Sequence, residues 1–343
     1  MEKYELITRG DIAATQSFVK RAKVSAFFDS CWEKLIYLFT ILSALMIVLI
    51  FIFILSKSWN IFAVNGFGLF TKTGFEEQIR NAYHASADQP VWEFGFLSLI
   101  IGTLATTLGA LVIAIPAGVG TAVIIAEMSW GWRKRFLESS VRLLASIPSV
   151  IYGLVGLMVM VPFIKQHLLT VDMQIKYLKY FQLTGRSMLA GIIVLSFMIV
   201  PMIIALSVDA INAVPKRYRE ASLALGLTKW RTITQVVIPA AKSGILAGII
   251  LATGRGIGEA IALSMVSGGI AVLPKLSHGF VFLFTPVLPL ASAIVNKSQA
   301  IAVPSIEAAL FACGVVLLII CALLSICTRI VETIVRRRQG LEE

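Results

Sequence analysis

The sequence predicts an all-α polytopic membrane protein with six transmembrane helices. Its 343 residues are 58% hydrophobic and 14% charged, with a mean hydropathy of +0.88. A soluble domain has roughly 45–50% apolar and about 25% charged residues, so this chain has too few polar side chains to cover a water-facing surface. Apolar stretches long enough to cross a bilayer recur along the chain, and basic residues concentrate in alternate segments between them.

The six predicted spans cover residues 35–55, 97–125, 143–164, 188–210, 245–271 and 306–328. A polar segment, residues 1–34, precedes the first span, and no small-residue cleavage pattern follows that span. We therefore expect the first span to remain as an anchor helix. A further apolar stretch at 279–294 is short and holds Pro286 and Pro289, which favours a re-entrant or external piece over a crossing.

The distribution of Lys and Arg predicts that both termini are cytoplasmic. One set of segments holds nineteen of these residues, in 1–34, 133–135, 216–242 and 329–338. The opposite set holds nine, in 56–96, 165–187 and 272–305. Because cytoplasmic loops are enriched in Lys and Arg, the first set belongs to the cytoplasm. This orientation predicts an external loop at 56–93, a cytoplasmic loop at 212–243 and a cytoplasmic tail at 332–343.

No catalytic or metal-binding pattern stands out in the sequence. The four cysteines and three histidines show neither disulfide spacing nor the spacing of metal ligands. The net charge of +11 is accounted for by loops beside membrane spans, so it does not indicate a nucleic-acid partner. We expect that this chain is not an enzyme and that it binds no metal or cofactor of its own.

The predicted cytoplasmic loop at 212–243 carries an ordered motif. The motif has the form E-A-S-x3-G-x9-V-x-I-P and consists of Glu220, Ala221, Ser222, Gly226, Val236, Ile238 and Pro239. Pro215 before a helical stretch and Gly226 after it predict a helix, a turn and a second helix along the membrane surface. We expect Lys216, Arg217 and Arg219 to face water. An amphipathic helix held by anionic lipid would explain these cations, but it would not explain the spacing.

This spacing resembles the EAA loop of ABC importer permeases, whose pattern is E-A-A-x3-G-x9-I-x-L-P. The departures, Ser222, Val236 and Ile238, are small changes of size. In that family the loop forms a coupling helix that docks into a cleft of the ATPase subunit. The resemblance implies the type I ABC importer permease architecture. It also implies that the motif couples this chain to an ATPase, through Glu220, Ala221, Ser222, Gly226 and Pro239.

A more specific resemblance covers residues 94–331. The stretches 94–127 and 141–162, and the sequence GRGIGEAIALSMVSG at 254–268, are similar to the permeases of Pst-type phosphate importers. The residues after Glu259 are similar to the C-type subunit, although the usual R-A-x-G-E-T-M-A-V reads R-G-I-G-E-A-I-A-L here. The resemblance implies a permease subunit in the prokaryotic plasma (inner) membrane. It also implies a second homologous permease, two ATPase subunits that bind ATP-Mg, and an external phosphate-binding protein.

Two charges lie in the predicted fifth span. Arg255 and Glu259 each cost about 2.5–3.5 kcal/mol at a bilayer centre. On a continuous helix they would share a face and could neutralise each other as a purely structural pair. Intramembrane ionisable residues usually line substrate paths, and the arginine fork suits phosphate oxygens. We therefore predict a substrate pathway or gate at Arg255 and Glu259, with room for close backbone approach at Gly254, Gly256 and Gly258.

Hydroxyl groups near a second kink, at Pro148, are weaker pathway candidates: Ser146, Ser149 and Tyr152. Helix packing, with hydroxyls bonded back to the preceding turn, would explain them equally well.

Other functions fit parts of the pattern. A permease for another oxyanion, such as sulfate or molybdate, would share the loop motif. An ion channel or proton-coupled carrier would use Arg255 and Glu259 as a relay and need no ATPase, but it leaves the motif spacing unexplained. A non-transporting scaffold would recruit cytoplasmic partners through the basic loop.

Overall fold

A computed structural model of the protein describes the backbone of residues 2–85, 90–178 and 180–337. It describes their side chains too, except at 2–31, 276–278, 328, 331, 332 and 334–337. Most of the predicted tail at 332–343 therefore lies outside the described side chains. The chain divides into two compact units, Met1–Ser56 and Lys57–Glu343. The first unit is part of helix α1 (Glu2–Asn65), so the polar segment predicted at 1–34 is helical from Glu2 onward.

The described residues are mostly helical, and their β pairing is limited to one isolated bridge between Gly268 and Val287. The helices after α1 are α2 (Gly68–Thr71), α3 (Phe75–His84), α4 (Leu97–Val123), η1 (Ile124–Met128), α5 (Gly131–Ala145), α6 (Ser149–Val155), η2 (Gly156–Met160), α7 (Val161–His167), α8 (Val171–Tyr177), α9 (Met188–Asn212), α10 (Lys216–Ala224), α11 (Lys229–Thr232), η3 (Ile233–Val237), α12 (Ile238–Ile257), α13 (Ile261–Val266), η4 (Leu276–Phe284), α14 (Leu290–Lys297), η5 (Ser298–Ala300) and α15 (Pro304–Arg337).

Six helical stretches of the described chain are long and apolar enough to cross a membrane. They are Trp32–Asn65, Leu97–Met128, Ser149–His167, Met188–Asn212, Lys229–Ile257 and Pro304–Cys327. The predicted all-α fold with six membrane helices is thus confirmed. The short stretch at 279–294 is not among the six.

Three of the six spans have bounds that differ clearly from the prediction, and the first span continues to Asn65 instead of ending at 55. The third begins at Ser149 instead of 143, because α5 ends at Ala145 and Pro148 precedes the first residue of α6. The fifth covers Lys229–Ile257 instead of 245–271. Its successive segments α11, η3 and α12 begin inside the predicted loop and end just after Arg255. Apolar length alone could not reveal the start of the third span or the end of the fifth, because the residues beyond them are also apolar, and the polar residues of 229–244 hid the start of the fifth.

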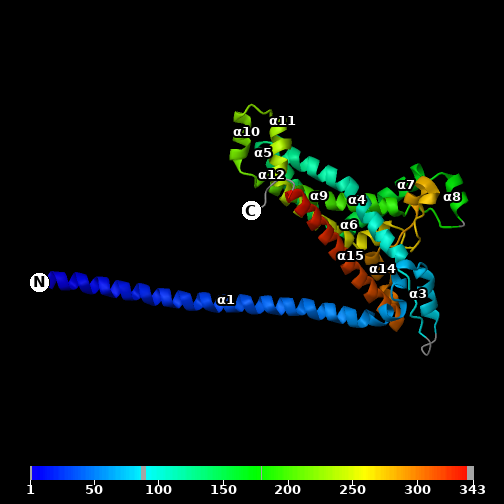
Figure 1. Ribbon diagram of the computed structural model, residues 1–343, viewed down its shortest axis with the longest axis horizontal. Helices are drawn as coiled ribbons and strands as arrows, with labels where there is room; N and C mark the ends of the chain where they lie inside the picture. The colour runs from blue at the N-terminus through cyan, green and yellow to red at the C-terminus, as the bar shows by residue number, and fades with distance from the viewer. Residues whose placement is uncertain (1, 86–89, 179, 338–343) are drawn as a thin grey trace. The chain divides into compact units, whose positions relative to one another are not determined.

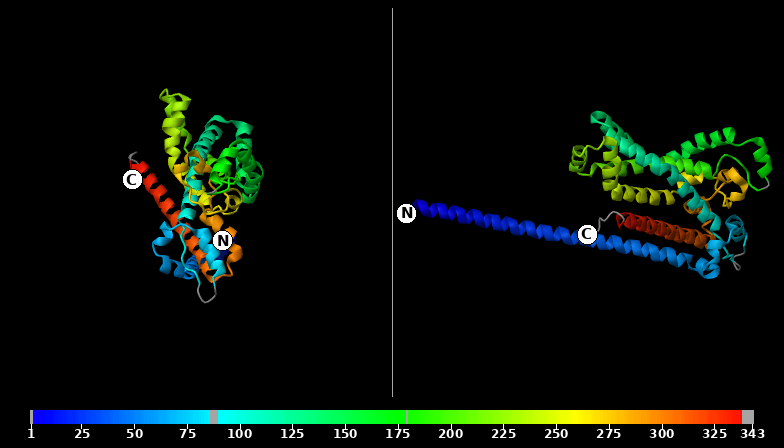
Figure 2. Two further views of the ribbon diagram at one scale, coloured as in Figure 1. Left: turned by 90° about the vertical axis from the view of Figure 1, so that its right-hand side faces the viewer. Right: turned by 45° about the horizontal axis from the view of Figure 1, so that its top comes forward.

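Helix α9 packs against α4, α5 and α12 in the second unit (Figures 1 and 2). Glycines set the distance between α9 and α12. A Cβ added at Gly244 would lie 2.6 Å from the Ala210 side chain, and one at Gly248 would lie 2.8 Å from that of Leu206. The small residues let the two helices approach closely and fix their register.

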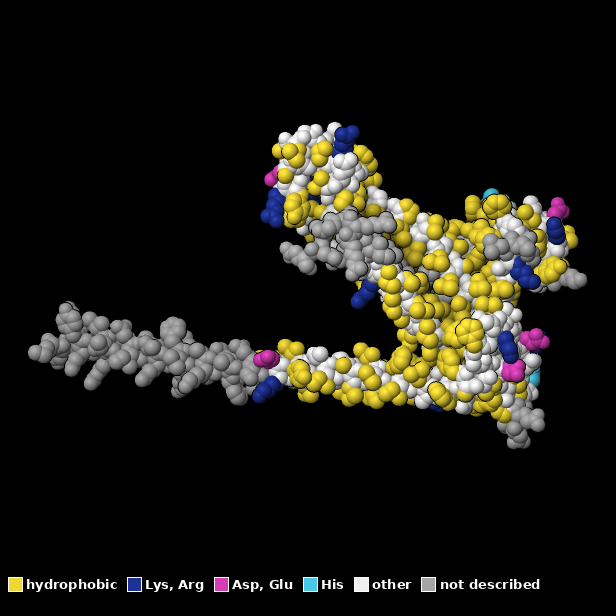
Figure 3. Space-filling view, in the orientation of Figure 1, with side chains coloured by type: hydrophobic (Ala, Val, Ile, Leu, Met, Phe, Trp, Pro, Cys, Tyr) yellow, Lys and Arg dark blue, Asp and Glu magenta, His cyan; other side chains and the backbone are white. Residues whose placement is uncertain are grey.

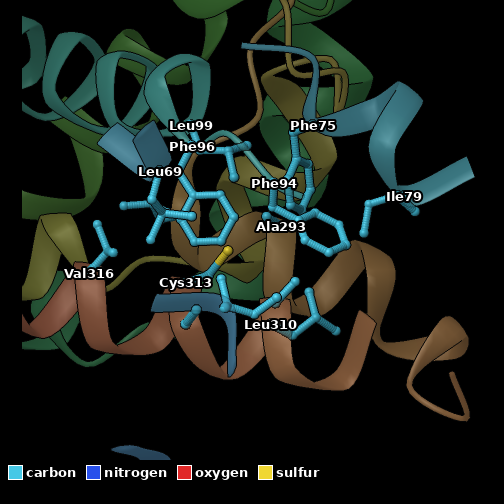
Figure 4. Close-up of a cluster of buried hydrophobic side chains, with 14 of the residues drawn as sticks. Leu69, Phe75, Ile79, Phe94, Phe96, Leu99, Ala293, Leu310, Cys313 and Val316 are labelled. Atoms are coloured by element: carbon cyan, nitrogen blue, oxygen red, sulfur yellow. The ribbon is translucent and has the colours of Figure 1, made fainter. Parts of the chain in front are cut away.

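A separate hydrophobic core joins the predicted outer loop at 56–93 to the last span (Figure 4). Phe75 and Phe96 meet edge to face with ring centroids 5.7 Å apart, a favourable geometry for aromatic pairs. Both rings are buried with Leu310 and Cys313 of α15. The outer loop is therefore a packed structure.

Candidate functional site

Arg255 lies in the last turn of the fifth span, beside the middle of α9. Its neighbour Gly256 faces α9, where an added Cβ would lie 3.7 Å from Ile199 and 3.8 Å from Leu195. Helix α9 has 25 residues, so at about 1.5 Å per residue it is about 37 Å long, and Val200 is its central residue. Because the hydrocarbon core of a bilayer is about 30 Å thick, an α9 helix centred in it places Arg255 close to the membrane midplane.

The helix that carries Arg255 stops directly after it. Helix α12 ends at Ile257, and the backbone N–H of Gly258 bonds to the carbonyl of Gly254. The next helix, α13, begins only at Ile261. The expectation that Arg255 and Glu259 share one helix face is therefore wrong, because the helix does not continue between them.

Glu259 has a different role in the fold. Its carboxylate oxygen Oε1 accepts a hydrogen bond from the backbone N–H of Ala262 at 2.9 Å, in the first turn of α13. The residue is 8% exposed. A carboxylate at this position satisfies an N–H group that has no partner within the helix and faces the positive end of the helix dipole. In the part of the chain that the structure describes, no ion pair joins Glu259 to Arg255.

Arg255 instead contacts the end of another broken helix. Its Nη1 donates to the carbonyl oxygen of Ala145, the last residue of α5, at 3.4 Å. The phenol of Tyr152 donates to the adjacent carbonyl of Leu144 at 2.9 Å, so Tyr152 and Arg255 both contact the end of α5. Helix carboxyl ends carry partial negative charge, so this position suits a cation.

The three hydroxyl candidates thus separate. Tyr152 lies beside Arg255, a proximity that no sequence argument indicated. Ser146 donates to the Leu143 carbonyl at 2.7 Å, which is the local back-bonding of the packing alternative. Ser149 is half-buried at the first residue of α6.

Two helix interruptions therefore meet near the midplane. The break between α5 and α6 lies beside Arg255, and α6 in turn packs closely on α13, which follows the other break. A Cβ added at Gly153 of α6 would lie 2.8 Å from the Ala262 Cα. Discontinuous helices at midplane depth are typical of membrane transport sites, because free backbone groups are tolerated there only beside protein or a water-filled path.

The glycines around Arg255 do not provide the close approach predicted within this chain. A Cβ added at Gly254 would have no neighbour within 4 Å, and one at Gly258 would meet only carbonyls of its own helix, at 3.6 Å or more. At Gly256 the contacts are ordinary van der Waals distances. The side of α12 at Gly254 is open in this chain.

The EAA-type motif forms the predicted helix, turn and second helix. Helix α10 ends before Gly226, whose φ of +82° is a left-handed conformation that favours glycine. Glu220 and Ala221 are exposed, as is Gly226, whereas Ser222 is buried. The Ser222 hydroxyl bonds to Thr232 Oγ1 of α11 at 3.0 Å, so it holds the two helices together and is not a docking surface. The fifth motif residue, Pro239, is half-buried at the start of α12.

Sequence reasoning missed an ion pair that holds this motif in place. Arg219 does not face water as expected. Its Nε and Nη2 donate to Glu127 Oε1 at 2.9 and 2.5 Å, and its remaining bonds go to the carbonyls of Ile211 and Val214. Glu127 lies at the end of the second span. A carboxylate at the end of an apolar span was the feature of the sequence that could have indicated a basic partner. The basic residues of α10 and α11 gather at one end of the second unit, whereas its middle is largely hydrophobic on the visible face (Figure 3).

Residues 114–338 match the family described as the binding-protein-dependent transport system inner membrane component. The chain belongs to this family. As an inner membrane component with six apolar helices, it is a multi-pass membrane protein with the fold of an ABC importer permease.

Several relatives have similar sequences. The chain is 31% identical over 314 residues to the phosphate transport system permease protein PstC of Pasteurella multocida, covering 89% of this chain and 90% of that one. It is 36% identical over 249 residues to PstC 1 of Mycobacterium tuberculosis, covering 69% and 71%. It is 42% identical over 183 residues to the probable ABC transporter permease protein YqgH of Bacillus subtilis; this match spans 53% of this chain and about half, 55%, of YqgH.

Proposed function

We propose that the protein is a permease subunit of an ATP-driven phosphate importer and forms half of its translocation pathway. The observation that carries the proposal is Arg255, a cation near the midplane beside two broken helices. Among the described residues it has no carboxylate partner. Relatives named as phosphate permeases, which align with most of the chain, support phosphate as the anion.

The site has the chemistry that an oxyanion pathway needs. Arginine keeps its charge at any physiological pH and offers a planar set of donors that matches phosphate oxygens. At 3.4 Å, the contact from Arg255 to the Ala145 carbonyl is long for a charge-assisted hydrogen bond. A phosphate oxygen can replace this carbonyl at small cost. Arg255 therefore gates the pathway while it is bound to the Ala145 carbonyl, and it lines the pathway when it binds phosphate instead.

The coupling role follows from the continuity of the fifth span. One helical stretch leads from Lys229, directly after the motif turn, to Ile257. When an ATPase subunit displaces α10, the movement is therefore transmitted to Arg255 along this one helical stretch. ATP-bound partners favour the outward-open arrangement, and the change of access is a shift between two populated conformations.

The remaining assignments belong to the same proposal. A second homologous permease pairs with this chain as a heterodimer, and the open side of α12 at Gly254 is available for it. Two ATPase subunits bind ATP-Mg and carry out hydrolysis, an external protein delivers phosphate, and this chain itself catalyses no reaction. Both termini are cytoplasmic in a prokaryotic inner membrane. A channel, a carrier without ATPase or a scaffold would not account for the family membership. The relatives named as phosphate permeases do not favour sulfate or molybdate.

The test is uptake by the complete transporter in reconstituted vesicles, with this chain, the second permease, the ATPase and the binding protein. We expect phosphate to accumulate only with ATP and all subunits, and an excess of sulfate or molybdate not to compete. Arg255→Gln should abolish most uptake without disturbing assembly, and Arg255→Lys should keep part of it. Wild-type uptake by Arg255→Gln would refute the pathway role, and uptake without the ATPase would refute the coupled mechanism.

A further inference from the structure

Exposed aromatic and basic side chains gather where the second span gives way to α5, and the proposed import mechanism does not use them. Trp130, Trp132 and Phe136 are 74%, 73% and 63% exposed. Trp132 and Phe136 lie on one side of α5, with ring centroids 6.3 Å apart. Together with Arg133 and Arg135, these residues are called the α5 entry patch below.

Contacts of Lys134 place this patch at the level of the lipid headgroups. The Lys134 ammonium donates to Asn212 Oδ1 at 2.8 Å and to the Ala126 carbonyl at 3.1 Å. Asn212 is the last residue of α9, whose length of about 37 Å exceeds the hydrocarbon thickness of about 30 Å. With Val200 near the midplane, Asn212 lies a few ångströms outside the hydrocarbon, within the headgroup layer.

The cations of the patch lack partners within the described chain. Arg133 and Arg135 are exposed and make no ion pair or hydrogen bond among the described side chains. No Asp or Glu occurs between Met128 and Leu137. Lys229 of α11 adds a further charge, because its ammonium lies 5.1 Å from the centre of the Trp130 ring.

The surface beside Trp130, Trp132 and Arg133 is hollow. A depression of about 490 Å³ is lined by the six residues from Met128 to Arg133. Tryptophan rings favour the headgroup layer, and basic residues attract anionic lipid there. Apolar rings, unpaired cations and a hollow at this depth match one kind of partner, a phospholipid whose headgroup carries net negative charge.

We propose that the α5 entry patch binds the headgroup of an anionic phospholipid in the cytoplasmic leaflet. The phosphodiester lies in the hollow beside Arg133, and the indole rings of Trp130 and Trp132 pack against the glycerol region. Arg135, two residues further along α5, points to another side of the helix and adds longer-range attraction for the headgroup. Since Lys229 contacts Trp130, the bound lipid also joins the start of α11 to α5. The proposal rests on the membrane location and on the proposed orientation of the chain, and it stands apart from the choice of transported substrate.

The test measures lipid retention by the full chain in detergent, using native mass spectrometry with phosphatidylglycerol and with phosphatidylcholine. We expect tight retention of phosphatidylglycerol only. R133Q/R135Q should weaken it about 30-fold, from about 1 kcal/mol for each basic residue near an anionic surface. R133K/R135K, which keeps the charges, should restore most of the affinity and shows that the fold is intact.

The matched control is K216Q/R217Q, which removes two exposed cations of α10 on the same side of the membrane. It should leave retention unchanged, and millimolar inorganic phosphate should not displace the lipid. Equal loss in both double variants, equal retention of phosphatidylcholine, or displacement by phosphate would overturn the proposal. Wild-type lipid retention by R133Q/R135Q together with weaker binding of the ATPase subunits would also overturn it, because the patch would then be a protein interface.

Discussion

We predict that the ion pair between Glu127 and Arg219 stabilises α10, the proposed coupling helix. Helix α10 has only nine residues, and a helix of this length is not stable in water by itself. Glu127→Gln leaves an acceptor but removes its charge. Arg219 keeps its charge, so the loss is that of its counter-charge in a partly buried site. We expect about 2 kcal/mol, within the range of about 1–3 kcal/mol for a buried polar group that loses its partner. The side chains are only 11% and 21% exposed, so water does little to reduce this loss.

Hydrogen exchange of the full chain in lipid nanodiscs measures this loss directly. If the free energy of local unfolding of α10 falls by about 2 kcal/mol, its amides exchange about 30-fold faster. Glu138→Gln is the matched control, because the Glu138 carboxylate lies 4.0 Å from the Lys134 ammonium and so contributes little. Unchanged exchange of α10 in Glu127→Gln, or the same acceleration in both variants, would refute the view that Glu127 holds the coupling helix.

Three further predictions concern the turn, the packing and the cap. Gly226→Asn should couple ATP hydrolysis to uptake better than Gly226→Val, since a left-handed backbone costs an ordinary residue about 1–2 kcal/mol; the readout is ATP hydrolysed per phosphate imported, and equal ratios would contradict it. Gly153→Ala should lower the melting temperature, because its Cβ would lie 2.8 Å from the Ala262 Cα, whereas Gly254→Ala, with no neighbour within 4 Å, should not. Glu259→Gln should keep the cap of α13 and most uptake, and Glu259→Ala should lose about 1 kcal/mol of stability; loss of uptake in the glutamine variant of a stable protein would assign a role to the charge.

Local sequence rules predicted some features of the site well and others poorly. The number of spans follows from apolar length, and the turn at Gly226 follows from a residue type that tolerates a positive φ. The end of α12 was not predicted. Glu259 was expected to continue the helix that carries Arg255, but its carboxylate instead caps the next helix, α13. The local sequence around Glu259 is compatible with a continuous helix and with a break that Glu259 caps. Only tertiary packing decides between these two arrangements.

Contacts between distant segments could not be predicted from one sequence at all. Arg255 and Ala145 are separated by 110 positions, and Arg219 and Glu127 by 92. In each case one partner is a backbone carbonyl or a single carboxylate, which leaves no periodic pattern to detect. The outer loop was unexplained for the same reason, since its phenylalanines become a core only when α15 packs against them.

The position of Glu259 changes what Arg255 can do. A charge near the midplane costs about 2.5–3.5 kcal/mol on the insertion scale, and an intrahelical partner would offset that cost permanently. An anion would then have to break a buried ion pair, which costs about 3–5 kcal/mol when one charge is left alone. Here the carboxylate is bound to the N–H of Ala262, and Arg255 has only a carbonyl at 3.4 Å. The fold therefore keeps the arginine's charge available, so an arriving anion gains the attraction that a glutamate partner would have cancelled.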